Sequence, residues 1–247
     1  MHTAWSGLAA AIVSGAVLFV APASAATFTP IDLPDLNLDI RGYTNGGSYS
    51  VILPLAGTSA IRTFNGVPFS LASSVGGNNI YNDPFTNGAL TLSPNIFGAS
   101  TVYTLMNSAF GVLGKQNATM EFTGSGGATY SVPIVQGSNI RDHFNGFFNN
   151  TIDNVSAVAA FQGAEDVRLD MQIFNLPAAL QTLTLTSIRF IGTQIDNPPA
   201  DGVPFLAAAT IATVSAVPEP QAYLMLAFGL LGVAAAVRRR SARASRR

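Results

Sequence analysis

Cysteine is absent from this chain, and histidine, tryptophan and charged residues are scarce. Without cysteine the protein has no disulfide, no thiol nucleophile and no thiolate metal site, so its fold depends on its core. The single tryptophan, Trp5, lies near the N-terminus, and His143 is the only histidine beyond the second residue. Charged residues make up 10% of the sequence. These shortages exclude thiol chemistry and leave few residues for a catalytic or metal-binding site.

The few charges are unevenly distributed along the chain. Six arginines lie between positions 238 and 247. The rest of the chain holds six basic residues against thirteen acidic ones, a net charge of −7. Because this part of the chain has no basic stripe that could neutralise phosphates, nucleic acid is excluded as a partner.

The N-terminus has the pattern of a secretory signal peptide over residues 1–25. Leu8–Val20 is apolar and of signal-peptide length, and Ala23-Ser24-Ala25 supplies the small residues of a cleavage site. Pro22 breaks any helix just before that site. The alternative is an uncleaved anchor, but about 13 apolar residues are too few to span a membrane. We therefore expect the exported chain to begin at Ala26.

The C-terminal segment, residues 215–247, contains three different elements in sequence. Val217-Pro218-Glu219-Pro220 comes first, and its two prolines impose an extended backbone. Residues 221–237 then carry no charge and are rich in Leu, Ala and Gly, which predicts a transmembrane helix. Its length of about 25 Å is marginal against a hydrocarbon core of about 30 Å. The basic residues Arg238, Arg239 and Arg240 open the tail 238–247 and hold it on the cytoplasmic side.

This three-part tail resembles the PEP-CTERM sorting signal of Gram-negative bacteria. The resemblance covers about 30 residues and rests on the Pro-Glu-Pro motif, the apolar helix and the arginine cluster in that order. It implies transient anchoring in the inner membrane and cleavage near the motif by an exosortase-like enzyme. Delivery to the cell surface or to an exopolysaccharide matrix would follow. The alternative is a simple tail anchor in which Pro-Glu-Pro occurs by accident.

Between these ends, residues 26–214 show the period-two pattern of β-strands. Val167–Ile173 alternates apolar and polar residues at every step, which predicts a strand with one buried face. Clusters of Gly, Asn, Pro and Ser separate the strand candidates and supply turns. The shorter candidates are Tyr49–Leu53, Val102–Met106, Ala118–Phe122, Thr129–Ile134 and Phe205–Val214. We expect one all-β domain, an antiparallel β-sandwich of jelly-roll type.

Three local features refine this fold prediction. The alternation after Leu183 changes phase, which predicts a β-bulge near Ser187. The glycine cluster between Phe122 and Ala128 predicts a hairpin turn. A short helix is predicted only at Asp153–Gln162.

The densest polar cluster of the domain is Arg141-Asp142-His143. A hydrolytic triad needs a nucleophile, a base and an orienting acid, and no Gly-x-Ser-x-Gly sequence accompanies this histidine. We interpret the segment as a structural loop in which Arg141 and Asp142 hold backbone groups, with ligand binding as the alternative. On this interpretation Asp142→Ala destabilises the domain and His143→Ala is nearly neutral. No catalytic residue and no cofactor is predicted.

Acidic residues supply the remaining candidates. Asp32, Asp35 and Asp39 are weak candidates for calcium, since Ca²⁺ prefers oxygen ligands, but they form no EF-hand loop. Another interpretation is a polysaccharide hydrolase that uses acids such as Glu121, Glu165 or Asp170.

The function predicted from these patterns is that of an exported, non-enzymatic protein. We expect a structural or adhesive component of the cell surface or exopolysaccharide matrix. Glycan binding is a candidate activity, because aromatic residues such as Tyr43, Tyr81 and Phe144 lie in turn-rich segments. The secreted hydrolase remains the alternative.

Overall fold

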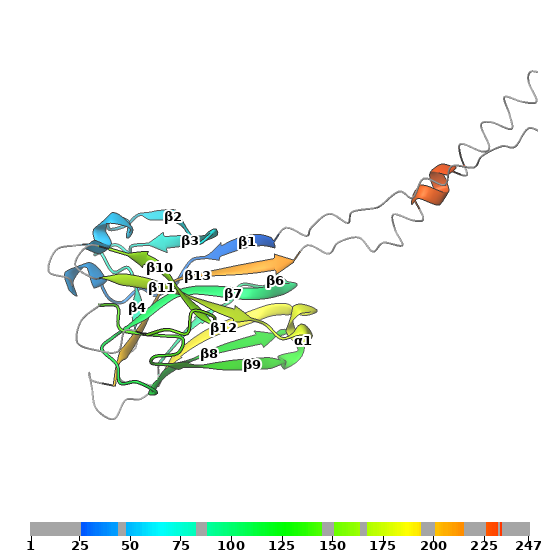
Figure 1. Cartoon of the computed structure of the whole chain (residues 1–247). Coiled ribbons are helices and arrows are strands. Elements are labelled where there is room, and N and C mark those ends of the chain that lie inside the picture. Colours follow the sequence, from blue (N-terminus) through cyan, green and yellow to red (C-terminus); the bar gives the residue numbers. More distant parts are fainter. Residues whose placement is uncertain are drawn as a thin grey trace, which may run out of the picture. The chain divides into compact units, whose positions relative to one another are not determined.

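The computed structural model describes residues 26–43, 48–82, 88–144, 151–163, 167–193, 201–214, 226–231 and 233. The chain divides into two compact units, residues 25–215 and residues 1–24 together with 216–247. We call the first unit the domain (Figure 1). The predicted signal peptide, the motif Val217-Pro218-Glu219-Pro220 and the arginines Arg238, Arg239 and Arg240 lie outside the described residues.

The domain is built on two large antiparallel sheets. The first sheet has the order β1-β13-β7-β11-β10, and β4 also pairs with β13. Its strands are β1 (Ala26–Ile31), β4 (Tyr81–Asn82), β7 (Ala99–Ala109), β10 (Ala157–Gln162), β11 (Arg168–Asn175) and β13 (Val203–Val214). The second sheet has the order β5-β12-β8-β9, and β6 also pairs with β12. Its strands are β5 (Ala89–Leu92), β6 (Ile96–Phe97), β8 (Gln116–Gly124), β9 (Thr129–Val135) and β12 (Thr184–Gly192).

Smaller elements complete the domain. The strands β2 (Ser59–Phe64) and β3 (Val67–Ala72) form a separate hairpin. Its turn is Asn65-Gly66, and both residues have positive φ, 49° and 82°, as two-residue hairpin turns require. Short helical turns lie at η1 (Ile40–Tyr43), η2 (Ser48–Val51), η3 (Ser125–Gly127) and α1 (Ala178–Gln181). The prediction of an all-β fold is confirmed.

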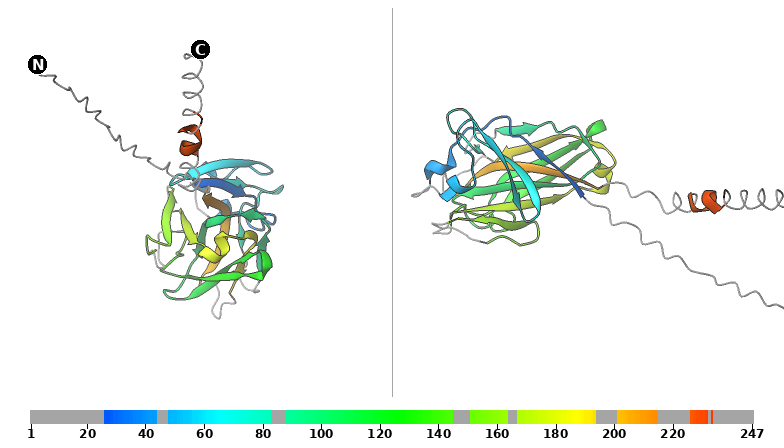
Figure 2. Two further views of the ribbon diagram at one scale, coloured as in Figure 1. Left: turned by 90° about the vertical axis from the view of Figure 1, so that its right-hand side faces the viewer. Right: turned by 90° about the horizontal axis from the view of Figure 1, so that it is seen from above.

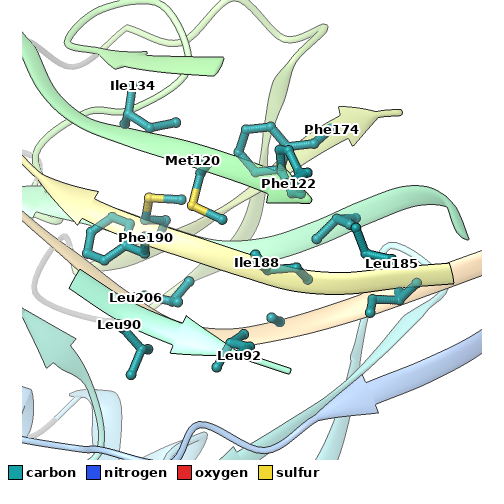
Figure 3. Close-up of a cluster of buried hydrophobic side chains, with 14 of the residues drawn as sticks. Leu90, Leu92, Met120, Phe122, Ile134, Phe174, Leu185, Ile188, Phe190 and Leu206 are labelled. Carbon is teal, nitrogen blue, oxygen red and sulfur yellow. The ribbon is translucent and has the colours of Figure 1, made fainter. Parts of the chain in front are cut away.

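One hydrophobic core lies between the two large sheets. Side chains of β7, β11 and β13 meet those of β5, β8, β9 and β12 in a single buried cluster. Figure 3 shows its centre, with Met120, Phe122 and Phe190. Other members are Leu90, Leu92, Ile134, Phe174, Leu185, Ile188 and Leu206. Burial of one face of the second sheet explains why apolar and polar residues alternate in β8 and β12.

A second core covers the opposite face of the first sheet. There the hairpin strand β3 and the segment of η2 pack on β7, β11 and β13. Along β3 the residues Val67, Phe69 and Leu71 are buried and alternate with partly exposed ones. Viewed end-on in Figure 2 (left), the cyan hairpin lies on one side of the orange strand β13, and β8, β9 and β12 of the second sheet (green and yellow) lie on the other. The central strands β7, β11 and β13 are therefore largely buried on both faces.

Most strand predictions are confirmed. The predicted strands at 102–106, 118–122, 129–134, 167–173 and 205–214 coincide with β7, β8, β9, β11 and β13. The bulge is also confirmed, because the pairing of β12 with β8 shifts register between Leu185 and Ser187. The predicted hairpin is formed by β8 and β9 around η3.

Two local predictions are wrong. Tyr49–Leu53 is not a strand: it begins in the 3-10 turn η2, which buries Tyr49. Asp153–Gln162 is not a helix, because Ala157–Gln162 forms β10. The Asp153 carboxylate accepts backbone hydrogen bonds from Val155, Ser156 and Ala157, as a helix cap would. The chain then pairs with β11 instead of continuing into a helix.

In the other unit, residues 226–231 and 233 are helical, and their apolar side chains are exposed. The rest of the predicted helix 221–237 lies outside the described residues. Within the part that is described, no helix has the length and apolar character needed to cross a membrane. The transmembrane helix stays a prediction.

Candidate functional site

The segment Arg141-Asp142-His143 lies between the end of β7 and the start of β11. Ser108 pairs with it in parallel fashion: its N–H donates to the carbonyl of Arg141 at 3.0 Å, and its carbonyl accepts from His143 N–H at 2.7 Å. On the other side, Arg168 N–H donates to the carbonyl of His143 at 2.9 Å. The segment is therefore held by backbone bonds on both sides.

Arg141 forms a two-point ion pair with Asp170 of β11. Its Nε and Nη2 lie 2.7 Å and 2.6 Å from the two carboxylate oxygens. The Asp170 side chain is fully buried, whereas 13% of the Arg141 side chain is exposed. Asn107 donates to the same carboxylate at 2.7 Å and accepts from Asp170 N–H at 2.8 Å. Each group of this buried pair thus has a charged or polar partner, which offsets the cost of desolvation.

The Asp142 carboxylate bonds to backbone groups. It accepts from Phe144 N–H at 3.1 Å, and the backbone amides of Phe110 and His143 also act on it. Burial nevertheless raises the pKa of Asp142 above its ordinary value, more than these amides lower it. This arrangement supports the structural role that we expect for Asp142.

Arg168 is a second buried arginine in the same place. Its Nε donates to the carbonyl of Asp142 at 2.8 Å. Burial lowers the pKa of this guanidinium, and the neighbouring positive charge of Arg141 contributes. Arg168 therefore fixes the backbone of the segment on the side opposite to Ser108.

His143 is buried, so His143→Ala, which we expected to be nearly neutral, would remove packed atoms. Its Nδ1 lies 3.3 Å from the hydroxyl of Tyr49, and its ring packs edge-on against Phe205. The Tyr49 hydroxyl donates its proton to the carbonyl of Arg168 at 2.7 Å, so we infer that Nδ1–H of His143 is the donor to Tyr49. Burial, with the charge of Arg168, lowers the pKa of His143 to about 4.

Sequence reasoning missed Tyr49, Asn107, Arg168 and Asp170 as partners of this segment. The alternation in Val167–Ile173 predicts a polar, exposed face, but Arg168, Asp170 and Gln172 are all buried. They are buried because each has partners: Gln172, for example, accepts from Thr104 and donates to the carbonyl of Met106. The available signal in the sequence was the adjacent, opposite charges of Arg141 and Asp142 in a chain where charged residues are rare.

The candidate calcium ligands do not form a cluster. Asp39 binds Arg41, which lowers the pKa of that carboxyl, and it also accepts from Asn79. Asp32 accepts from Ser70, and Asp35 is exposed. Among the described residues, no group of three or more His, Asp or Glu side chains could hold a metal ion.

The candidate hydrolytic acids are engaged in other interactions. Asp170 is buried against Arg141 and Asn107. Glu121 of β8 accepts from Arg189 of β12 at 2.9 Å. Glu165 lies outside the described residues. A glycoside hydrolase needs two carboxyl groups facing one sugar, and the partners of Asp170 and Glu121 favour structural roles instead.

Comparison with known families identifies the tail. Residues 216–240 match the PEP-CTERM protein-sorting motif, as the sequence resemblance implied. No curated protein matches the chain. The match indicates that an exosortase-type enzyme sorts this protein to the surface or the exterior of the cell.

Proposed function

We propose that this exported protein is a structural or adhesive component of the cell surface or exopolysaccharide matrix and that it binds glycan. The observation that carries the proposal is the sorting motif at residues 216–240. An exosortase-like enzyme cleaves the chain near Val217-Pro218-Glu219-Pro220 after transient anchoring in the inner membrane. The released domain then reaches the matrix.

The order of the tail elements supports this pathway on physical grounds. Two prolines keep the motif out of a helix, so that a processing enzyme meets an extended backbone. The apolar segment 221–237 halts in the membrane, and the arginines beyond it resist translocation. The motif is thereby exposed on the outer side, next to the membrane.

We further propose that the domain is a jelly-roll β-sandwich. When β1, β5, β7, β8, β9, β11, β12 and β13 are numbered one to eight, the two sheets read 1-8-3-6 and 2-7-4-5. This strand order supports a jelly roll, an architecture found in lectin domains and in many others. The fold alone therefore does not specify the ligand.

Polysaccharide hydrolysis is the second candidate function. A general acid or base must be accessible to its substrate. Asp170 and Glu121 are instead engaged in ion pairs with arginines, which favours glycan binding over glycan hydrolysis as the function.

The two functions can be separated with polysaccharide isolated from the producing bacterium. We expect the purified protein to sediment with this polysaccharide and to release no reducing ends from it. Release of reducing ends that follows the protein concentration would support the hydrolase, and the absence of any sedimentation would contradict the adhesive function.

A further inference from the structure

Phe110, directly after β7, has a backbone conformation that is rare for an aromatic residue. Its φ is +63°, in the left-handed region. Its carbonyl accepts from the Ser108 hydroxyl at 2.7 Å and from the Gln136 side chain at 2.9 Å. Ser108 and Gln136 are both buried. Such strain persists only where the surroundings enforce it, and it occurs preferentially at functional sites.

Phe144 is placed at a matching position on the neighbouring segment. Ser108 and Asp142 form a parallel bridge, and Phe110 and Phe144 each lie two residues beyond it. The Asp142 carboxylate accepts from Phe144 N–H at 3.1 Å. A single buried framework therefore fixes the backbone of both phenylalanines.

Both aromatic side chains reach the solvent. Phe110 is 39% exposed and Phe144 is 42% exposed, and the loop that follows Phe110 also exposes Val112 and Leu113. Hydrogen bonds hold the backbone of both residues, so less conformational entropy remains to be lost when a ligand binds.

Two cationic side chains near this surface, Arg141 and Lys115, have carboxylate partners. Arg141 is engaged with Asp170. Lys115, at the end of the loop, lies 4.0 Å from the carboxylate of Asp201. An anionic ligand would have to compete with these carboxylates, so the surface favours a neutral one.

Phe110 lies at one end of the strand pair β7–β13. Ala109, next to Phe110, pairs with Val203 at the start of β13, whereas Ala26, at the start of β1, pairs with Val214 at its end. From its first to its last residue, the 12-residue strand β13 spans 11 steps of roughly 3.3 Å, or about 36 Å. Figure 1 shows β13 running toward the end at which β1 begins. Phe110 thus lies at the end of β13 that is remote from Ala26 and Val214.

We propose that Phe110 and Phe144 form a stacking surface for a neutral polysaccharide. The apolar C–H faces of pyranose rings pack against aromatic faces, and the surface offers two of these in a fixed frame. Asp142 is a positioning residue for both. This inference rests on the proposed function and specifies its ligand class and its site.

The test is binding of the full-length protein, purified in detergent, to the neutral polysaccharide fraction of the producing bacterium. Phe110→Gly removes the ring at a backbone position that suits glycine, and Phe144→Ala removes the second ring. We expect the double variant to bind about ten-fold more weakly or worse. Phe97→Ala is the matched control, because Phe97 is also exposed but lies on β6 in the other sheet. We expect it to bind like the wild type.

Thermal unfolding of each variant separates a lost ring from a lost fold. The midpoint of Phe110→Gly should stay near that of the wild type, because relief of the left-handed backbone offsets part of the lost burial. Undiminished binding by the double variant would refute this site and leave the proposed function standing. Failure of the wild-type protein to bind any polysaccharide fraction would instead refute the proposed function. Preference for an acidic fraction, or ring-dependent sedimentation with phospholipid vesicles, would overturn the ligand class.

Discussion

Two arginine–carboxylate pairs in the domain have the same chemistry in different surroundings. Arg189 and Glu121 face each other across β12 and β8 at 2.9 Å, with 41% and 27% of their side chains exposed. Arg141 and Asp170 approach to 2.6 Å, with 13% and none of their side chains exposed. Water solvates the charges of the first pair, whereas the charge of Asp170 is stabilised by protein groups alone.

This difference in exposure determines how much each pair contributes to the stability of the domain. An exposed pair adds little, because water and salt already stabilise the separated charges. Removing one partner of a buried pair leaves a charge without solvent, which destabilises the fold strongly. We therefore expect the buried framework around Asp170, and not the pair on β8 and β12, to determine stability and the placement of the two exposed phenylalanines.

The largest effect is expected for Asp170→Asn. It keeps the shape of the side chain but removes the partner charge of Arg141, at a cost of about 3–5 kcal/mol in the free energy of unfolding. Urea unfolding followed by circular dichroism measures this loss. A loss below that of Glu121→Gln would remove the distinction between the two pairs.

Asp142→Ala should cost less, about 1–3 kcal/mol, because it leaves backbone N–H groups such as that of Phe144 without an acceptor. Asp142→Asn retains one acceptor oxygen and should recover part of the loss. Equal denaturation midpoints for Asp142→Ala and the wild type would show that the carboxylate does not hold this segment.

The pH dependence of stability tests the burial of His143. Its folded-state pKa of about 4 lies below the ordinary 6.5, so the unfolded chain takes up a proton that the folded chain excludes. The free energy of unfolding should therefore fall as the pH is lowered from 6.5 toward 4, by on the order of 3 kcal/mol. Arg168 and Tyr49 face this ring, and Asp142, whose pKa is raised, acts in the opposite direction at the acid end.

His143→Gln is the matched control for this pH dependence, since glutamine does not titrate. Its unfolding free energy should change less between pH 6.5 and 4 than that of the wild type. The same acid sensitivity in both proteins would place the titrating group elsewhere.

The smallest effect is expected for Glu121→Gln. The exposed pair with Arg189 contributes at most about 1 kcal/mol, and less as salt is added. Unfolding at low and at high ionic strength measures it. A large, salt-independent loss would mean that exposure does not distinguish the two pairs.

The strand pattern of the domain could be predicted because burial of one apolar face produces alternation, as in β8 and β12. The bulge near Ser187 was predictable for the same reason, since a change of phase along one strand requires an extra residue. The turn η2 was not predictable. Tyr49 has strand propensity, but its hydroxyl bonds to Arg168, which lies 119 positions further along the chain.

The candidate segment was recognised as Arg141-Asp142-His143, but its partners were not. Asp170 is one of the polar residues of an alternating strand. Alternation alone does not show whether such a residue faces water or a buried polar partner. Contacts with residues distant in sequence, such as Asn107 and Arg141, determine that Asp170 is buried. The sorting motif of the tail was recognisable from the sequence, because its elements are contiguous and form a linear signal.

The central claim, sorting by the tail, is tested most directly by replacing Pro218, Glu219 and Pro220 with alanine in the producing bacterium. The measurement is the amount of protein in the inner-membrane and extracellular fractions, together with its mass. The account predicts that the variant is exported but stays in the inner membrane at full length, because segment 221–237 and the arginines remain. Normal amounts of free, tail-less variant outside the cell would contradict it.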